Sequence, residues 1–251
     1  MFNNETLNAV DAELMSRFDQ TADSYDSQRY LSHAGMFFNE LEVYVVNEWT
    51  LGGRGSRGLD IPCGTGRLTI SLAHRCEEVV AGDISTQMIA IAQERTSHQG
   101  VTNVTFQQVN GRKLPFSENT FDTIICFNFL HLIPNDQKGE LITEFSRVLK
   151  IGGKLIVEFN SPLYGLFLGL LRYRRRLGEI PRRCFFPGQG RRLFRGYRKG
   201  HAVGIGFPFL WLLARIFGKN VMMKVSLTLG RIPVLRFLAY AIVFELYKEK
   251  K

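Results

Sequence analysis

Residues 58–68 read Gly-Leu-Asp-Ile-Pro-Cys-Gly-Thr-Gly-Arg-Leu, a short apolar run followed by a glycine-bearing turn. Residues 68–73 then have helical character, so the pattern predicts a strand, a tight loop and a helix. Gly64 and Gly66 let the backbone approach a ligand without an intervening Cβ atom, and the N–H groups that open the helix are donors for a polar or anionic group. The loop is typical of a nucleotide-like cofactor site, although similar turns also occur merely to join a strand to a helix.

A carboxylate further along the chain favours the cofactor interpretation. The apolar run at residues 79–82 ends at Asp83, seventeen residues beyond Gly66. In open α/β sheets, an acidic residue at this point accepts hydrogen bonds from ribose hydroxyls. The spacing therefore predicts that the loop and Asp83 hold parts of one ligand.

Four motifs in sequence order resemble the class I S-adenosylmethionine-dependent methyltransferases, in particular those that act on quinones and lipids. The resemblance covers about residues 18–160 and departs from the family pattern at two positions. The first glycine of the glycine-rich signature is Pro62, and the aspartate after the third strand is Asn110, which keeps an acceptor for an adenine amino group. Neither departure is expected to abolish cofactor binding. The motifs lie at residues 59–66, at 82–88, at 114–116 with 119–122, and at 130–134 followed by 147–155.

The resemblance implies S-adenosylmethionine as the cofactor and gives each motif residue a role. The implied contacts are Asp60 and Gly64 at the methionine end, Gly66 in the loop, Asp83 at the ribose, Ile84 on the adenine face, Asn110 and Gly111 at the adenine edge, and Phe127 near the sulfonium.

Two further side chains each have two interpretations. Tyr25 lies in a segment that resembles the family's N-terminal cap and would close over the cofactor, but it is equally consistent with a surface helix. His131 is predicted at the start of a helix. An imidazole, whose ordinary pKa is about 6.5, would there deprotonate or orient an acceptor hydroxyl. The simpler alternative is a histidine that lines the pocket or caps the helix.

The composition indicates a globular chain, with 45% apolar and 22% charged residues among 251, which we interpret as one methyltransferase-like domain over residues 1–251. The four cysteines lie far apart, so neither a metal site nor a disulfide framework is predicted, and a reducing cytoplasm fits. Residues 1–15 are polar and acidic and lack the apolar core of a secretory signal.

The charge is divided unevenly along the chain. Residues 1–160 carry 13 Lys and Arg against 20 Asp and Glu, whereas residues 161–251 carry 19 against 3. Arginines interleaved with apolar and aromatic residues are typical of a segment that lies in a membrane interface, although a solvated basic face is the alternative. The longest uncharged run of this tail, residues 201–214, is shorter than the roughly 20 residues that cross a bilayer. We therefore expect peripheral docking on an anionic membrane from the cytoplasmic side.

Apolar runs alternate with helical segments, which predicts a Rossmann-like, doubly wound sheet of seven strands, parallel except for one reversed strand, with helices on both faces. Because ligands bind at the carboxyl ends of such strands, the loop, Asp83, Asn110 and Phe127 with Asn128 are expected around one crevice. We interpret residues 1–50 as a helical cap, 58–160 as the cofactor-binding core, and 161–251 as a basic, apolar part that completes the sheet. Residues 52–56 are predicted as a flexible break, residues 162–176 and 208–229 as helical insertions, and residues 188–199 as a helix.

The favoured function is methyl transfer to a small lipophilic acceptor, such as a quinone, an isoprenoid or another lipid. A DNA partner is not expected, and an RNA substrate is disfavoured because residues 128–131 lack the Pro-Pro-aromatic pattern of base methylases. Three alternatives remain: transfer of another group, such as amination of a quinone in rhodoquinone formation; RNA methylation; and a non-catalytic partner that only binds the cofactor.

Overall fold

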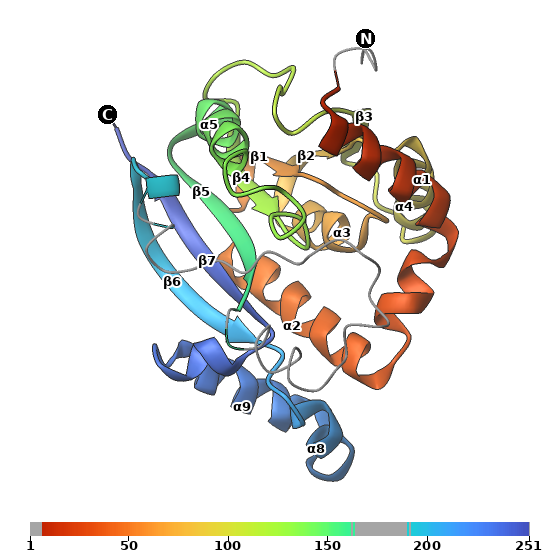
Figure 1. Cartoon of the computed structure of the whole chain (residues 1–251), viewed down its shortest axis with the longest axis vertical. Coiled ribbons are helices and arrows are strands. Elements are labelled where there is room, and N and C mark those ends of the chain that lie inside the picture. Colours follow the sequence, from red (N-terminus) through yellow and green to blue (C-terminus); the bar gives the residue numbers. More distant parts are fainter. Residues whose placement is uncertain (1–6, 162, 164–189, 191, 251) are drawn as a thin grey trace.

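Seven strands form one sheet in the order β3-β2-β1-β4-β5-β7-β6 (Figure 1). The computed structural model describes residues 7–161, 163, 190 and 192–250. Strand β7 is antiparallel to both of its neighbours, while the other pairs are parallel. This arrangement confirms the predicted fold class. The strands are β1 (Gly53–Asp60), β2 (Cys76–Asp83), β3 (Val104–Gln108), β4 (Phe121–Cys126), β5 (Leu149–Asn160), β6 (Tyr197–Ile205) and β7 (Ala241–Lys248).

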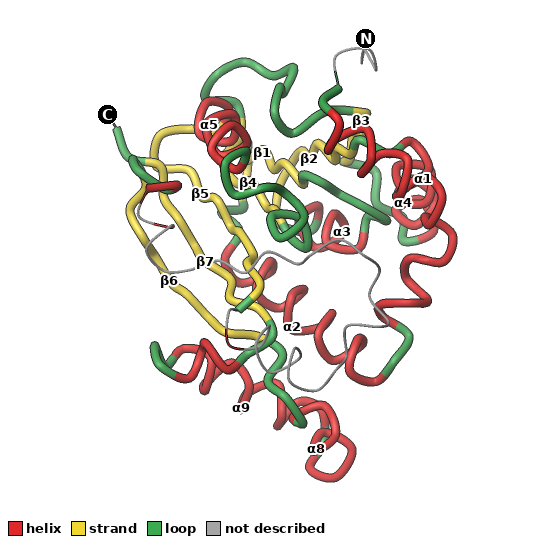
Figure 2. The backbone as a smooth tube through the Cα atoms, viewed as in Figure 1, coloured by secondary structure: helices red, strands yellow, loops and turns green. Residues whose placement is uncertain are grey.

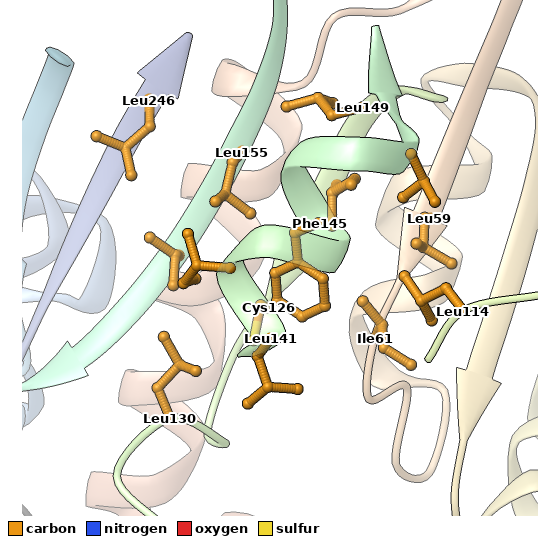
Figure 3. Close-up of a cluster of buried hydrophobic side chains, with 14 of the residues drawn as sticks. Leu59, Ile61, Leu114, Cys126, Leu130, Leu141, Phe145, Leu149, Leu155 and Leu246 are labelled. Atoms are coloured by element: carbon orange, nitrogen blue, oxygen red, sulfur yellow. The ribbon is translucent and has the colours of Figure 1, made fainter. Parts of the chain in front are cut away.

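Helices cover both faces of the sheet, as Figure 2 shows in red against the yellow strands. On one face, α5 contributes Phe145, which lies against the side chains of β1 and β5 (Figure 3). On the other face, α2, α3, α8 and α9 bury a second apolar cluster. The helices are α1 (Ala9–Tyr30), α2 (His33–Trp49), α3 (Arg67–Ala73), α4 (Thr86–His98), α5 (Lys138–Val148), α8 (Leu210–Phe217) and α9 (Lys219–Arg231), followed by a short 3-10 helix η3 (Leu235–Leu238).

The tail returns to the carboxyl edge of the sheet. Asn160 at the end of β5 pairs with Ala241 at the start of β7, and Ala241 also pairs with Ile205 at the end of β6. Helices α8 and α9 connect β6 to β7, so they lie beside the same edge at which β1, β2 and β4 end (Figure 1). This edge is where ligands bind in open α/β sheets.

Two local predictions are wrong. Residues 53–56 are not a flexible break, because they begin β1: Gly53 pairs with Cys76 and its N–H donates to Arg75 O at 3.1 Å. Residues 197–199 belong to β6 rather than to a helix, because they pair with β7. The predicted helical insertion over residues 208–229 corresponds to α8 and α9, whereas that at 162–176 lies outside the described residues except for residue 163.

Candidate functional site

A cavity opens at the carboxyl ends of β1, β2 and β4. The glycine-bearing loop after β1 forms its floor, and α1 lies across it. Seven of the side chains and loop positions predicted from the sequence line this cavity, namely Tyr25, Asp60, Gly64, Asp83, Ile84, Phe127 and Asn128. Gly66 and His131 are not part of its lining.

Asp60 ends β1 as a buried carboxylate. The Thr69 hydroxyl on α3 donates to its Oδ2 atom at 2.6 Å. Burial raises the pKa of Asp60 to about 7, although the Thr69 hydrogen bond and the Arg67 charge oppose that rise. A buried carboxylate with this pKa favours a ligand that brings a positive charge or hydrogen-bond donors, because either stabilises its charged form.

Asp83 ends β2 in a similar environment. Its Oδ2 accepts the N–H of Gly64 at 2.8 Å, and its Oδ1 accepts the N–H of Ser85 at 3.0 Å. Burial raises its pKa to about 6 against the effect of these hydrogen bonds. The carboxylate therefore ties the loop to the second strand, and it keeps lone pairs for donors from a ligand.

Glycine is required at the two loop positions for different structural reasons. Both have positive φ, 53° at Gly64 and 77° at Gly66. A Cβ atom at Gly66 would lie 2.8 Å from the Cβ of Ala92 on α4, whereas a Cβ at Gly64 would meet no atom within 4 Å. Gly66 therefore allows α4 to pack against the loop, and Gly64 keeps space open at the cavity wall.

Helix α1 is held over the cavity by three aspartates that recur every seven or eight residues on one side of the helix. Asp19 accepts the Ser85 hydroxyl at 2.6 Å. Asp26 accepts the Thr65 hydroxyl at 2.9 Å and forms an ion pair with Arg95. The third contact joins Asp11 to Arg112 at 2.9 Å. These contacts connect α1 to the loops that follow β1, β2 and β3.

Asn110 and Gly111 line a smaller cavity next to the first, and Ile84 lines both. The Asn110 side-chain amide is already paired within the protein. Its Nδ2 donates to Asp11 Oδ2 at 2.9 Å, and its Oδ1 accepts the Arg112 N–H at 2.9 Å. The predicted contact with an adenine edge stays a prediction for both residues.

His131 does not lie at the start of a helix, which corrects that prediction. Consecutive turns occupy this segment, since the Leu132 N–H donates to Phe129 O at 2.8 Å, and α5 begins only at Lys138. The His131 side chain is buried. Its role in proton transfer stays a prediction.

Sequence reasoning missed three charged residues beside the cavity, of which Glu42 and Glu158 are buried. Arg29 of α1, Glu42 of α2 and Glu158 of β5 meet around Asn128, which follows β4 and lines the cavity. Glu158 gave the one usable signal, because a carboxylate interrupts the apolar run of residues 155–159 in a strand predicted to be buried. We name Arg29, Glu42, Asn128 and Glu158 the polar cluster.

The described part of the chain has neither a grouped set of metal ligands nor a membrane-spanning helix. Over residues 7–161 and 192–250, no three His, Cys, Asp or Glu side chains are grouped so that they could hold a metal ion. No helix among the described residues is long and apolar enough to span a membrane.

Comparison with known proteins agrees with this geometry. Residues 59–153, which contain the loop, Asp83 and β4, match the family model described as a methyltransferase domain. This segment is therefore similar to the methyltransferase domain that the sequence motifs predicted. The ubiquinone/menaquinone biosynthesis C-methyltransferase UbiE of Azotobacter vinelandii is 40% identical over 115 residues, which are 43% of this chain and 44% of the relative. The chain matches about half the length of the first curated relatives.

Solved structures extend the likeness to the methyltransferase fold as a whole. Magnesium protoporphyrin IX methyltransferase from Synechocystis, solved with bound S-adenosylhomocysteine, has a TM-score of 0.68 at 17% identity and covers 95% of this chain and 99% of its own. The [4+2]-cyclase SpnF has a TM-score of 0.67 at 18% identity and covers 96% and 97%. At these identities the likeness concerns the fold, and the methyltransferase domain is common to different reactions.

Proposed function

We propose that this protein binds S-adenosylmethionine in the cavity and methylates a carbon atom of a lipophilic, quinone-like acceptor. The observation that carries the proposal is the pair of buried carboxylates, Asp60 and Asp83, on either side of the glycine-bearing loop. The acceptor class is supported by the relatives, which are ubiquinone/menaquinone biosynthesis C-methyltransferases.

The chain's own residues suit this cofactor. Asp60 would accept from the amino group of the methionine part and Asp83 from the ribose hydroxyls, while Ile84 would pack on the adenine. Gly64 leaves the wall open for the ligand, and Tyr25 closes it from α1. When bound, S-adenosylmethionine supplies an electrophilic methyl group with a good leaving group, so the protein's tasks are to position the acceptor and exclude water.

We further propose that α8 and its flanks dock on an anionic membrane. Apolar side chains are exposed there, among them Phe209 at 62% and Ile216 at 72%. Exposed basic residues lie on α8 and on the adjoining helix α9. Buried apolar area and about 1 kcal/mol per basic residue near an anionic surface together favour such docking. We name this surface the docking surface: Phe209, Leu212, Leu213, Ile216, Phe217 and Val221, with Arg215, Lys219 and Lys224.

The docking proposal has a matched control. Ile151 is also exposed, at 56%, but it lies near the start of β5, at the opposite edge of the sheet from α8. The Ile216→Asp variant should no longer float with anionic liposomes, whereas the Ile151→Asp variant should float as the wild type does. Equal flotation of both variants, or no preference of the wild type for anionic over neutral liposomes, would contradict docking through α8.

Assay of the purified protein with labelled S-adenosylmethionine and a lipid extract tests the reaction. We expect S-adenosylhomocysteine and an acceptor that has gained one methyl group, both identified by mass spectrometry. An acceptor that gains nitrogen would support the amination alternative, tight salt-dependent RNA binding would support the RNA alternative, and cofactor binding without turnover would support a non-catalytic role.

A further inference from the structure

The smaller cavity and the cofactor cavity share one wall. Four residues line both of them, namely Leu14 of α1, Pro62, Ile84 and Phe129. A ligand that lies along this wall would extend from the glycine-bearing loop into the smaller cavity. The walls of the smaller cavity therefore decide which chemical group can form the far end of that ligand.

The smaller cavity is apolar except at two side chains. Among the described residues that line it, only Asp11 and Asn110 carry polar side chains. Ile61, Val109 and Leu141 are buried apolar residues that complete the lining. Such a lining suits a flat, mainly apolar ring with a polar edge, and the two polar side chains fix the orientation of that edge.

The two polar side chains differ in the acceptor capacity that they keep. Asn110 Nδ2 donates to Asp11 Oδ2 and Asn110 Oδ1 accepts the Arg112 N–H, so one lone pair of a neutral oxygen remains. Arg112 Nε donates to both carboxylate oxygens of Asp11, at 3.0 Å and 2.9 Å. A carboxylate offers about four lone-pair sites, so Asp11 can accept a further donor.

Asp11 is also the stronger acceptor of the two. Hydrogen bonds to a charged group contribute more than those between neutral groups. The side chain is 4% exposed, and the charge of Arg112 keeps its buried carboxylate compensated. Asp11 and Leu14 are three residues apart on α1, so they project from the same side of the helix toward the cavity.

We propose that Asp11 determines which base the cofactor carries: its carboxylate accepts a hydrogen bond from the exocyclic amino group of adenine, while Asn110 and Arg112 hold the carboxylate in place. The inference rests on the proposed function, since it takes S-adenosylmethionine as the ligand. It assigns the selection of the base to α1 rather than to the loop after β3. Because Asp11 reaches the smaller cavity only while α1 lies over it, recognition of the amino group also stabilises the closed position of this helix.

The test compares two ligands by calorimetry at pH 8: S-adenosylhomocysteine and its 6-deamino analogue, in which purine replaces adenine. The wild type should bind S-adenosylhomocysteine about 10–100-fold more tightly, the effect of one hydrogen bond to a charged acceptor. Asp11→Ala should bring this ratio close to one. Asp11→Asn, which keeps the size of the side chain but not its charge, should give an intermediate ratio and serves if the alanine variant does not fold.

The matched control is Asp19→Ala, which removes another contact of α1, the hydrogen bond from the Ser85 hydroxyl. This variant should keep the wild-type ratio even if it binds both ligands more weakly. A ratio compares two ligands on one protein, so a general loss of stability cancels.

Three outcomes overturn the proposal. A wild-type ratio in the Asp11 variants would mean that another group accepts from the amino group. Equal loss of the ratio in Asp11→Ala and Asp19→Ala would show that closure of α1, and not the Asp11 carboxylate, selects the base. A ratio near one in the wild type would show that the amino group is not recognised. Absence of any S-adenosylhomocysteine binding by the wild type would instead refute the proposed function, and the assignment of the base with it.

Discussion

The two loop glycines provide a matched pair of alanine substitutions. The one at Gly66 should mainly lower stability, and the one at Gly64 should mainly weaken cofactor binding. Both have positive φ, so alanine at either position costs about 1–2 kcal/mol of backbone strain. At Gly66 the added Cβ would also lie 2.8 Å from the Ala92 Cβ and 2.9 Å from its Cα, well inside ordinary carbon contact distances. Such overpacking costs a further amount of about 1–3 kcal/mol. We therefore expect Gly66→Ala to lower the free energy of unfolding by about 2–5 kcal/mol and Gly64→Ala by about 1–2 kcal/mol.

For cofactor binding, by contrast, the substitution at Gly64 is the one expected to have the effect. Gly64 lines the cavity, and its added methyl group would occupy space that no protein atom uses. We expect Gly64→Ala to weaken S-adenosylhomocysteine binding at least about tenfold, or about 1.4 kcal/mol, although it remains well folded. Urea denaturation measures the first effect and isothermal calorimetry the second. Equal destabilisation by the two variants would refute the role of α4 packing, and wild-type affinity in Gly64→Ala would mean that the cofactor does not lie against this wall.

Three further expectations concern the carboxylates. Asp83→Ala should weaken S-adenosylhomocysteine binding by about 1.5–3 kcal/mol for each hydrogen bond lost to the charged acceptor, and calorimetry that finds no change would show that Asp83 does not face the ribose. Cofactor affinity should fall as pH decreases through the window from about 7 to about 6, because protonated Asp60 and Asp83 accept donors poorly; a flat profile from pH 8 to pH 5.5 would contradict this. Asp60→Asn should stabilise the unliganded fold more at pH 8 than at pH 4, since the folded-state pKa of about 7 exceeds the ordinary 3.8 and the wild type loses stability as pH rises between these values. The upper limit of that gain is about 4 kcal/mol, and denaturation curves that give the same difference at both pH values would refute it.

The sequence was sufficient for the core because its signals are local. A strand, a glycine-bearing turn and a helix follow one another within residues 58–73, and Asp83 ends the next strand, so spacing alone brings them to one edge. The strands of the tail, β6 and β7, were also predictable from apolar runs together with the family resemblance. The start of β1 was missed because glycine-rich segments favour turns, whereas here pairing with β2 holds residues 53–56 extended.

The polar cluster could not be predicted in the same way. Glu42 and Glu158 are separated by more than a hundred residues, and the tertiary fold brings both carboxylates to Asn128. The placement of His131 failed for a related reason, because the chain makes turns up to residue 137 before α5 begins. Neither event leaves a periodic pattern in the sequence.

The attachment of α1 through Asp11, Asp19 and Asp26 has a consequence for kinetics. Side chains of α1 line the cavity, so we expect release of the spent cofactor to depend on movement of this helix away from the loops. The ion pair of Asp26 with Arg95 is partly exposed and can be exchanged for contacts with water at small net cost, whereas that of Asp11 with Arg112 is buried. We therefore expect substitution of a single aspartate on α1 to change the residence time of the product without changing any group that touches the reacting atoms.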